Sequence, residues 1–213
     1  MNRVPLRTVA VFDFDKTLST RDNVLPFLVA VAGRCAVLQA LARSLPLLLR
    51  GRRDAVKASL VERLLTGRSA VGVRDVAARL AHDIVARHLR PDVRARAEWH
   101  CRSGHDVAVV SASFTWYLEP VARDLGLDAV LATELEVVDG ILTGALVGPN
   151  VRGAEKVRRL DAWFAGEPAR VWAYGDSAGD RALLARADVA VRVTRAPLAA
   201  IPEADSSPGR VAR

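Results

Sequence analysis

Short apolar runs that end in polar clusters recur along this chain and predict a parallel sheet. Four-residue runs with the composition of buried strands lie at 9–12, 107–110 and 171–174. Polar residues follow each run at once, at 13–17, 111–113 and 175–180. In open α/β sheets, ligands bind beyond the carboxyl ends of the strands. We therefore expect the three polar clusters to converge in one crevice.

The spacing of these runs predicts a large insertion. A plain βαβ unit would place its second strand about 30 residues after the first, but Asp13 and Ser111 are 98 positions apart. The intervening pattern is helical, and glycines at positions 33, 51 and 67 separate its segments. The predicted helices cover 24–32, 36–49, 53–65 and 73–90, and a core helix follows from Pro91 to about 103.

The second half returns to alternating α/β order. An Asp-Gly pair at 139–140 favours a type I′ turn and therefore a hairpin. In chain order we expect a helix at 116–125, a strand at 129–132, hairpin strands at 135–138 and 141–147, a helix at 154–164, a strand at 170–174, a helix at 181–187 and a strand at 189–193.

These elements predict an α/β fold with a doubly wound, mostly parallel, Rossmann-like sheet and an inserted all-helical cap. The core domain is expected at 1–19 and 92–203, and the cap at 20–91. The last ten residues, 204–213, contain a Ser-Ser-Pro-Gly stretch and are expected to be a disordered tail.

The first polar cluster has the residue types needed for phosphate transfer. A carboxylate such as Asp13 can attack phosphorus and form an aspartyl-phosphate. A second carboxylate, Asp15, can protonate the leaving oxygen and then take a proton from water. In a strand, side chains two positions apart lie on the same face of the sheet, so Asp13 and Asp15 would share a face if the extended backbone continued as far as Asp15. Neighbouring carboxylates call for a cation, and Mg²⁺ prefers oxygen ligands of this kind.

The other clusters supply partners for that chemistry. Asp176 is the natural additional metal ligand, and Asp180 lies one helical turn further on. The hydroxyl groups of Thr17 and Ser111 can donate to phosphoryl oxygens, and Lys156 can neutralise charge that develops in the transition state. Each residue alone also fits a turn, a helix cap or a solvated helix, so the prediction rests on all four clusters occurring together.

With these residues the chain resembles the haloacid dehalogenase-like phosphohydrolases, whose motifs DxDx[TV], Ser or Thr, Lys, and [GD]Dxxx[DN] occur here in order between 13 and 180. The resemblance implies that Asp13 is the nucleophile and Asp15 the general acid/base. It implies that Asp13, the backbone carbonyl of Asp15, and Asp176 hold Mg²⁺, with Asp180 supporting. It assigns the phosphoryl group to Thr17, Ser111 and Lys156. The cap position resembles the phosphoserine phosphatase-like subclass.

The substrate stays open between several alternatives. Phosphoserine phosphatases usually carry DxDST, Ser-Gly-Gly and GDGxND, where this chain has Asp-Phe-Asp-Lys-Thr, Ser-Ala-Ser and Gly-Asp-Ser-Ala-Gly-Asp. They place a Glu nine residues after the nucleophile for the substrate amine, and this chain has Asp22 there. The Ser-Ala-Ser triplet and the stretch 148–156 resemble the phosphatidylglycerophosphatase branch. A small phosphorylated metabolite, a phospholipid head group and serine phosphate are the candidates, and a non-catalytic basic binding protein is the alternative class.

The net charge of +7 belongs entirely to the predicted cap. Residues 20–91 hold 13 Lys or Arg and 5 Asp or Glu, whereas the rest of the chain holds 18 and 19. A solvated arginine-rich face and a surface that attracts an anionic partner are both compatible with this excess. Nucleic acid is not expected, because Phe27 is the cap's only aromatic residue and base stacking needs a platform.

One segment of the cap raises the possibility of peripheral contact with an anionic membrane. The apolar stretch 45–49 continues directly into Arg-Gly-Arg-Arg at 50–53. A helix lying in the membrane interface would have this composition, but we expect the leucines to form the cap's own core. Cys35 and Cys101 are expected to be buried, reduced thiols. The N-terminus leads straight into the first strand, so a cytoplasmic location is expected, with peripheral contact at the membrane as the alternative.

Overall fold

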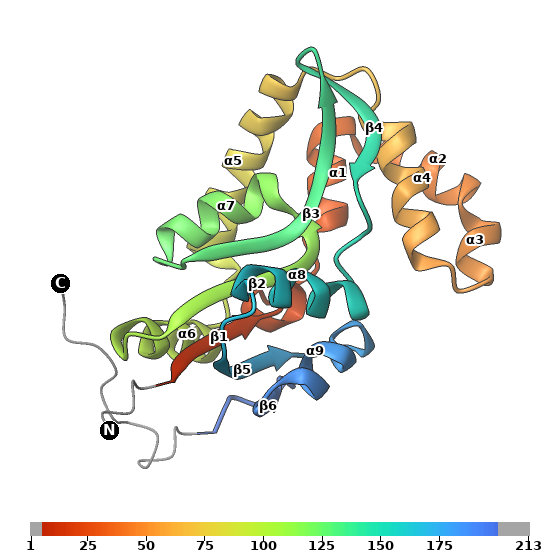
Figure 1. The fold of residues 1–213 in the computed structure, drawn as a ribbon. Coiled ribbons are helices and arrows are strands. Elements are labelled where there is room, and N and C mark those ends of the chain that lie inside the picture. Colours follow the sequence, from red (N-terminus) through yellow and green to blue (C-terminus); the bar gives the residue numbers. More distant parts are fainter. Residues whose placement is uncertain (1–5, 200–213) are drawn as a thin grey trace, which may run out of the picture.

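A six-stranded sheet forms the centre of the molecule in the computed structural model, which describes residues 6–199 (Figure 1). The strand order is β4-β3-β2-β1-β5-β6, and every neighbouring pair is parallel except β3 with β4. This arrangement confirms the predicted α/β fold with a mostly parallel sheet. The strands are β1 (Arg7–Phe12), β2 (Asp106–Phe114), β3 (Ala129–Val138), β4 (Ile141–Val147), β5 (Ala169–Gly175) and β6 (Val189–Arg192).

Helices cover both faces of the sheet because its central strands are apolar on both faces. In β1, Ala10 and Phe12 join a large core, whereas Val9 and Val11 join a second core on the opposite face. The first core includes α6 (Pro91–Arg102) and α7 (Thr115–Asp124), and the second includes α8 (Ala154–Phe164) and α9 (Arg181–Arg186).

Five α-helices lie between β1 and α6, where the sequence predicts an inserted segment of four. They are α1 (Val24–Ala32), α2 (Arg34–Arg43), α3 (Leu45–Leu49), α4 (Arg53–Leu65) and α5 (Ala70–Arg87). The single helix predicted at 36–49 is wrong, because the chain breaks at Ser44, whose hydroxyl donates to the Ala40 carbonyl oxygen. Pro46 favours the break because it fits the first turn of a new helix but not a helix interior.

Two antiparallel connecting segments join these helices to the core. The backbone N–H of Thr20 donates to the His88 carbonyl oxygen at 2.7 Å, and that of Arg90 donates to the Leu18 carbonyl oxygen at 2.9 Å. This pairing ends α5 at Arg87, before the predicted limit. The division into a core and a cap at 20–91 stays a prediction, and the predicted tail at 204–213 lies outside the described residues.

The β3–β4 hairpin reaches from the sheet up to the cap helices (Figure 1). Its two predicted strands at 129–132 and 135–138 are one strand, because an irregular register with β2 replaces the expected break. The backbone N–H of Gly67 donates to Leu142 at 2.9 Å, and that of Ala70 donates to Gly140 at 2.8 Å. At Gly144, with φ of 87°, a Cβ would clash with Thr66, so glycine permits this close approach.

The prediction that both cysteines are buried is wrong. Cys35 is exposed, because the buried residues of α2 are Val37 and Ala40. Cys101 is partly exposed at the end of α6, and burial raises the pKa of its thiol.

Candidate active site

A tight turn directly after β1 presents the first polar cluster. Asp13 keeps an extended backbone, and the turn then closes with a hydrogen bond from the Ser19 N–H to the Phe14 carbonyl oxygen at 2.8 Å. Lys16 takes a left-handed conformation with φ of 61°, which side chains with a Cβ adopt at a cost. The strand ends at Phe12 and the turn begins at Phe14, between the two aspartates, so the condition for Asp13 and Asp15 to lie on the same face is not met.

Asp13 contacts a buried lysine that lies 143 positions further along the chain. Lys156, in the first turn of α8, is 2% exposed, and its Nζ lies 2.5 Å from Oδ1 of Asp13 and 2.5 Å from Oδ1 of Asp180. Burial raises the pKa of Asp13 to about 6, although Lys156 acts in the opposite direction. Burial would lower the pKa of Lys156, but its two carboxylate partners raise it above its usual value. The lysine is therefore a fixed positive charge.

The loop after β5 adds two more carboxylates beside Asp13. Asp180 forms a capping box with Ser177, accepting from its backbone N–H at 2.9 Å and its hydroxyl at 2.7 Å. At Gly175 a Cβ would lie 2.5 Å from the Asp180 Cβ, so only glycine leaves room for this loop. Burial, together with Asp180, raises the pKa of Asp176. The loop therefore positions acidic groups at the end of β5.

Three carboxylates fit a small, hard cation. One oxygen each from Asp13, Asp176 and Asp180 can lie within 4.8 Å of one another. Oxygen-only donors of this kind suit Mg²⁺. Asp180 already accepts from Lys156 and Ser177, so its first role is to hold those groups. Asp13 also accepts from Lys156 and from the Thr17 hydroxyl, so the assignment of Asp13 and Asp176 as ligands with Asp180 supporting stays a prediction.

Asp15 turns away from this cluster toward the cap. Its Oδ1 accepts from both the backbone N–H and the side-chain amide of Asn23 at 2.9 Å, and its Oδ2 accepts from the Ser113 hydroxyl at 2.5 Å. Burial raises the pKa of Asp15 to about 7, and the nearby Asp22 carboxylate adds to the shift. A carboxyl group that titrates near neutral pH suits a general acid/base.

The two hydroxyl residues of the predicted phosphate site are both buried. Thr17 Oγ1 donates to Oδ2 of Asp13 at 3.2 Å and lies 3.4 Å from Oδ1 of Asp176. Ser111 lies at the irregular end of β2, and its Oγ accepts from the Ser113 N–H at 3.0 Å. Thr17 thus joins the acidic cluster directly, whereas Ser111 is joined to Asp15 through Ser113.

Asp22 is placed at the start of α1, where it is exposed. Its Oδ1 accepts from the Val24 N–H at 3.0 Å, which is a local helix-start contact. The neighbouring Asn23 is fully buried and was missed by sequence reasoning. Ser113 was missed too, although its spacing of two from Ser111 along a strand is a signal for the same face.

Lys57 is a further missed residue, because a lysine in the middle of a helix normally points into solvent. It is 9% exposed on α4, and its Nζ donates to the Ala112 carbonyl oxygen and, at 2.7 Å, to Oδ1 of Asn150. Burial lowers its pKa to about 7, although Asp15 acts to raise it. A cap helix therefore brings a titratable amine next to the second motif.

Asn150 is fixed by contacts from both parts of the molecule. Its amide nitrogen donates to Oδ1 of Asp54 on α4 at 2.7 Å, and its Oδ1 accepts from the Thr133 hydroxyl at 2.9 Å. These bonds join the cap, the β3 strand and the loop before α8 at one point.

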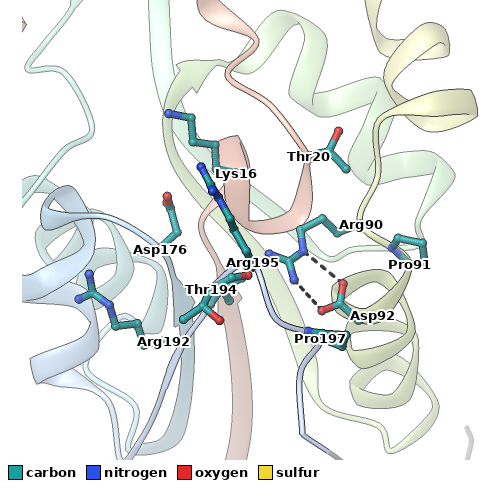
Figure 2. A pocket seen from close by; sticks show the side chains of 11 residues that line it. Lys16, Thr20, Arg90, Pro91, Asp92, Asp176, Arg192, Thr194, Arg195 and Pro197 are labelled. Atoms are coloured by element: carbon teal, nitrogen blue, oxygen red, sulfur yellow. Dashed lines mark hydrogen bonds and ion pairs between the residues drawn. The ribbon is translucent and has the colours of Figure 1, made fainter.

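A cavity of about 860 Å³ opens beside the acidic cluster (Figure 2). Asp176 lies on its wall, and Arg90 is neutralised there by Asp92 at 2.7 Å. The remaining basic side chains on the wall form no ion pair within 6–199; they are Lys16, Arg192 and Arg195. The wall gives an anionic ligand a positively charged approach to the cluster.

The fold and this site together define a phosphatase. The family model for haloacid dehalogenase-like hydrolases matches residues 10–185, and the chain belongs to that family. It is 33% identical over 192 residues to Protein CicA of Caulobacter vibrioides, covering 88% of this chain and 86% of that protein. It is 35% identical over 196 residues to phosphoserine phosphatase SerB2 of Mycobacterium tuberculosis, covering 90% of this chain but 45% of SerB2.

The likeness extends to solved structures. A protein of unknown function from Bordetella pertussis superposes with a TM-score of 0.70 at 25% identity, covering 84% of this chain and 86% of that one. The overall fold is therefore shared with a solved structure as well as with sequence relatives.

Proposed function

We propose that this chain is a Mg²⁺-dependent phosphomonoester hydrolase that works through an aspartyl-phosphate on Asp13. The observation that carries the proposal is the buried contact between Asp13 and Lys156 beside Thr17 and Asp176. A nucleophile, a fixed cation, a hydroxyl donor and a metal-binding carboxylate thus surround one small volume. A phosphoryl group bound there would meet each of them at once.

The first half of the reaction forms the covalent intermediate. A carboxylate oxygen of Asp13 attacks phosphorus, the bond from phosphorus to the leaving oxygen breaks, and protonated Asp15 transfers its proton to that oxygen. Lys156 and Thr17 donate to the phosphoryl oxygens as negative charge redistributes over them. Ser111 is proposed as a further donor. When bound by Asp13, Asp176 and the Asp15 backbone carbonyl, Mg²⁺ would supply additional positive charge beside the phosphoryl group.

The second half releases phosphate. Deprotonated Asp15 takes a proton from water while the water oxygen attacks phosphorus, and the bond from phosphorus to Asp13 breaks. Inorganic phosphate leaves, and both aspartates return to their starting protonation states. The Asn23 and Ser113 hydrogen bonds hold the Asp15 carboxyl in one orientation for both transfers.

The leaving group is proposed to be small and polar. Asp22, Lys57 and Asn150 flank the Asp15 side of the site and offer both signs of charge. Relatives named phosphoserine phosphatase make serine phosphate the first candidate, with Asp22 facing the amine. A phosphorylated lipid head group is the second candidate, and the exposed side chains of Leu48 and Leu49 favour it.

Trapping the intermediate tests the proposal. Enzyme mixed with ³²P-labelled substrate and Mg²⁺ and then quenched in acid should carry label that hydroxylamine removes, as an acyl phosphate requires. Asp13→Asn should carry no label and show no turnover, because an amide cannot attack phosphorus. Asp124→Asn, an exposed carboxylate on α7, is the matched control and should behave as wild type. Wild-type turnover in Asp13→Asn would overturn the mechanism, and inactivity across amino-acid, sugar, nucleotide and lipid monophosphates would favour the non-catalytic alternative.

A further inference from the structure

The cap carries a leucine-rich edge that faces solvent. Four side chains, which we call the leucine edge, are exposed by 65%, 51%, 43% and 80% of their surface: Leu38, Leu45, Leu48 and Leu49. None of the five residues of α3 is buried. The prediction that these leucines form the cap's own core is therefore wrong, because the short α3 packs only Leu47 partly against it. Exposed apolar side chains gathered on two neighbouring short helices mark a contact surface.

Arginines border the leucine edge. Exposed Arg43 lies at the end of α2, and Arg50, Arg52 and Arg53 follow α3 directly. Within residues 6–199, none of these four guanidinium groups forms an ion pair. Figure 1 shows α2 and α3 at the outer edge of the cap, away from the sheet. Apolar side chains beside unpaired cations are the pattern of helices that lie in a membrane interface.

We propose that the leucine edge and its flanking arginines dock onto an anionic lipid surface. The leucines would enter the boundary between head groups and acyl chains, while the arginines pair with anionic head groups. A second copy of this chain fits less well, because a symmetric contact would place the same arginines against each other. Nucleic acid would pair with the arginines but leave the leucines in water.

The secondary structure limits how the chain can meet a bilayer. No single helix among the described residues is long and apolar enough to cross a membrane, although the bent pair α1–α2 passes the same test by length and composition. Contact through α3 needs only a five-residue helix lying on the surface. The docking surface is therefore local to the α2–α3 edge and the start of α4.

The docking surface and the active site share one helix. Arg53 begins α4, and Lys57 lies about one turn further along, where its amine reaches Asn150. A protein docked by this edge would hold the cap side of its active site near the lipid head groups. This second step, toward a phosphorylated head group as substrate, rests on the proposed function, whereas the docking does not.

Sedimentation with vesicles tests the docking. The full chain should sediment with phosphatidylcholine vesicles that contain phosphatidylglycerol and not with phosphatidylcholine alone. Replacing Arg50, Arg52 and Arg53 with Ser should weaken binding by about 100-fold, since each basic residue near the surface contributes about 1 kcal/mol. The control variant Arg79→Ser/Arg123→Ser/Arg181→Ser removes the same charge from exposed arginines elsewhere and should bind within a few-fold of wild type.

Two leucine variants separate a membrane from other partners. Leu48→Ser/Leu49→Ser should weaken binding by roughly tenfold or more, because each loses an apolar side chain that would leave water. Leu49→Trp should show a blue shift of its fluorescence only with anionic vesicles. No binding to either vesicle, equal binding to both, or an equal loss in the control variant would overturn the docking. A dimer in analytical ultracentrifugation that the serine variant dissolves would assign the leucine edge to a second copy instead.

The arginine and leucine variants also distinguish the docking proposal from the proposed phosphatase function. Their turnover of a small soluble phosphate should match wild type, because neither leucine edge nor arginines contact the acidic cluster. Vesicle binding by a chain without phosphatase activity would overturn the proposed function and leave the docking. Phosphatase activity without vesicle binding would overturn the docking and leave the proposed function.

Discussion

The amine of Lys57 lies 2.7 Å from Oδ1 of Asn150, so a helix of the cap and a loop of the core meet beside Asp15. The same amine donates to the Ala112 carbonyl oxygen, between Ser111 and Ser113. A movement that lifts α4 from the core must therefore break charge-assisted hydrogen bonds next to the catalytic groups. The closed arrangement is linked in this way to the second motif.

Lys57→Met should raise the KM by about 10- to 100-fold, since a hydrogen bond to a charged group contributes about 1.5–3 kcal/mol. The kcat should change less, because Lys57 does not contact Asp13. Asn150→Ala should have a similar effect, and the double variant should cost less than the sum of the two, as expected for residues in contact. Steady-state kinetics on one soluble substrate measures all three. Full additivity would show that the two residues act separately.

Asp15→Asn should slow turnover of an alkyl phosphate by about 10²–10⁴-fold, because its leaving oxygen needs a proton. With p-nitrophenyl phosphate the leaving group departs unaided, but the second step still lacks its base. A stopped-flow trace should therefore show one equivalent of nitrophenolate in a burst, followed by slow turnover. A slow first turnover without a burst would argue against a role in the second step.

The raised pKa of Asp15, about 7, also sets an expected pH dependence. The carboxyl group must be protonated to donate, so kcat for an alkyl phosphate should fall as the pH rises through 7. The corresponding fall should be absent with p-nitrophenyl phosphate when the first step is measured in the burst. Identical pH profiles for both substrates would remove Asp15 from the role of acid.

Metal removal should silence the enzyme. EDTA should abolish turnover and Mg²⁺ should restore it, whereas Ca²⁺ should substitute poorly because its larger, looser coordination misplaces the reacting oxygens. Asp176→Asn should raise the Mg²⁺ concentration needed for half-maximal activity by at least tenfold. Titration of activity against Mg²⁺ gives that value, and Asp188→Asn, whose carboxylate accepts from the Val171 N–H at the other end of β5, is the control. Unchanged activity in chelated buffer would contradict the metal site.

A buried histidine makes stability depend on pH. His100 is fully buried, with Nε2 2.9 Å from the Tyr174 hydroxyl oxygen and Nδ1 2.8 Å from Nδ1 of His105. Burial lowers its pKa from 6.5 to about 3, with His105 and Arg96 adding to the shift. The unfolded chain binds a proton near pH 6.5 and the folded chain does not. The stability contributed by neutral His100 is therefore full above pH 6.5 and is lost as the pH falls toward 3.

Urea unfolding should reveal this loss as a difference between two proteins: relative to His100→Gln, the wild type should lose about 2 kcal/mol of stability between pH 7 and pH 5, at about 1.4 kcal/mol per pH unit below 6.5. His100→Gln should be less stable at pH 7 but should lose less on acidification. His82→Gln, on the exposed face of α5, should keep the wild-type slope. A wild-type slope in His100→Gln would assign the acid sensitivity to other groups.

The sheet and the four motifs could be predicted from the sequence because each depends on a local pattern. Buried strands are continuous apolar runs, and Asp13, Ser111 and Asp176 follow such runs directly. Motif order also assigned Lys156 and Asp180 to the same site, but the ion pair between them was not predicted.

Residues whose role depends on packing between distant segments escaped prediction. Lys57 has the pattern of a solvated helix residue, and it is buried only because α4 packs against β4 and the lysine side chain reaches the end of β2. The exposure of Leu48 and Leu49 was not predicted from the sequence for the opposite reason. An apolar run predicts burial, and periodicity does not reveal that a short helix has nothing packed over it.

The backbone hydrogen bonds of Gly67 and Ala70 with the β3–β4 hairpin limit how this molecule can be recombined with its relatives. A chimera that exchanges only residues 20–91 would bring in helices shaped for another hairpin. The contact at Gly144 tolerates no added Cβ, so a foreign hairpin with a larger residue there would push α4 away. The unit to exchange is thus two separate stretches of chain, the inserted helices and the hairpin. We expect substrate preference to be transferred to a chimera only when both stretches are exchanged together.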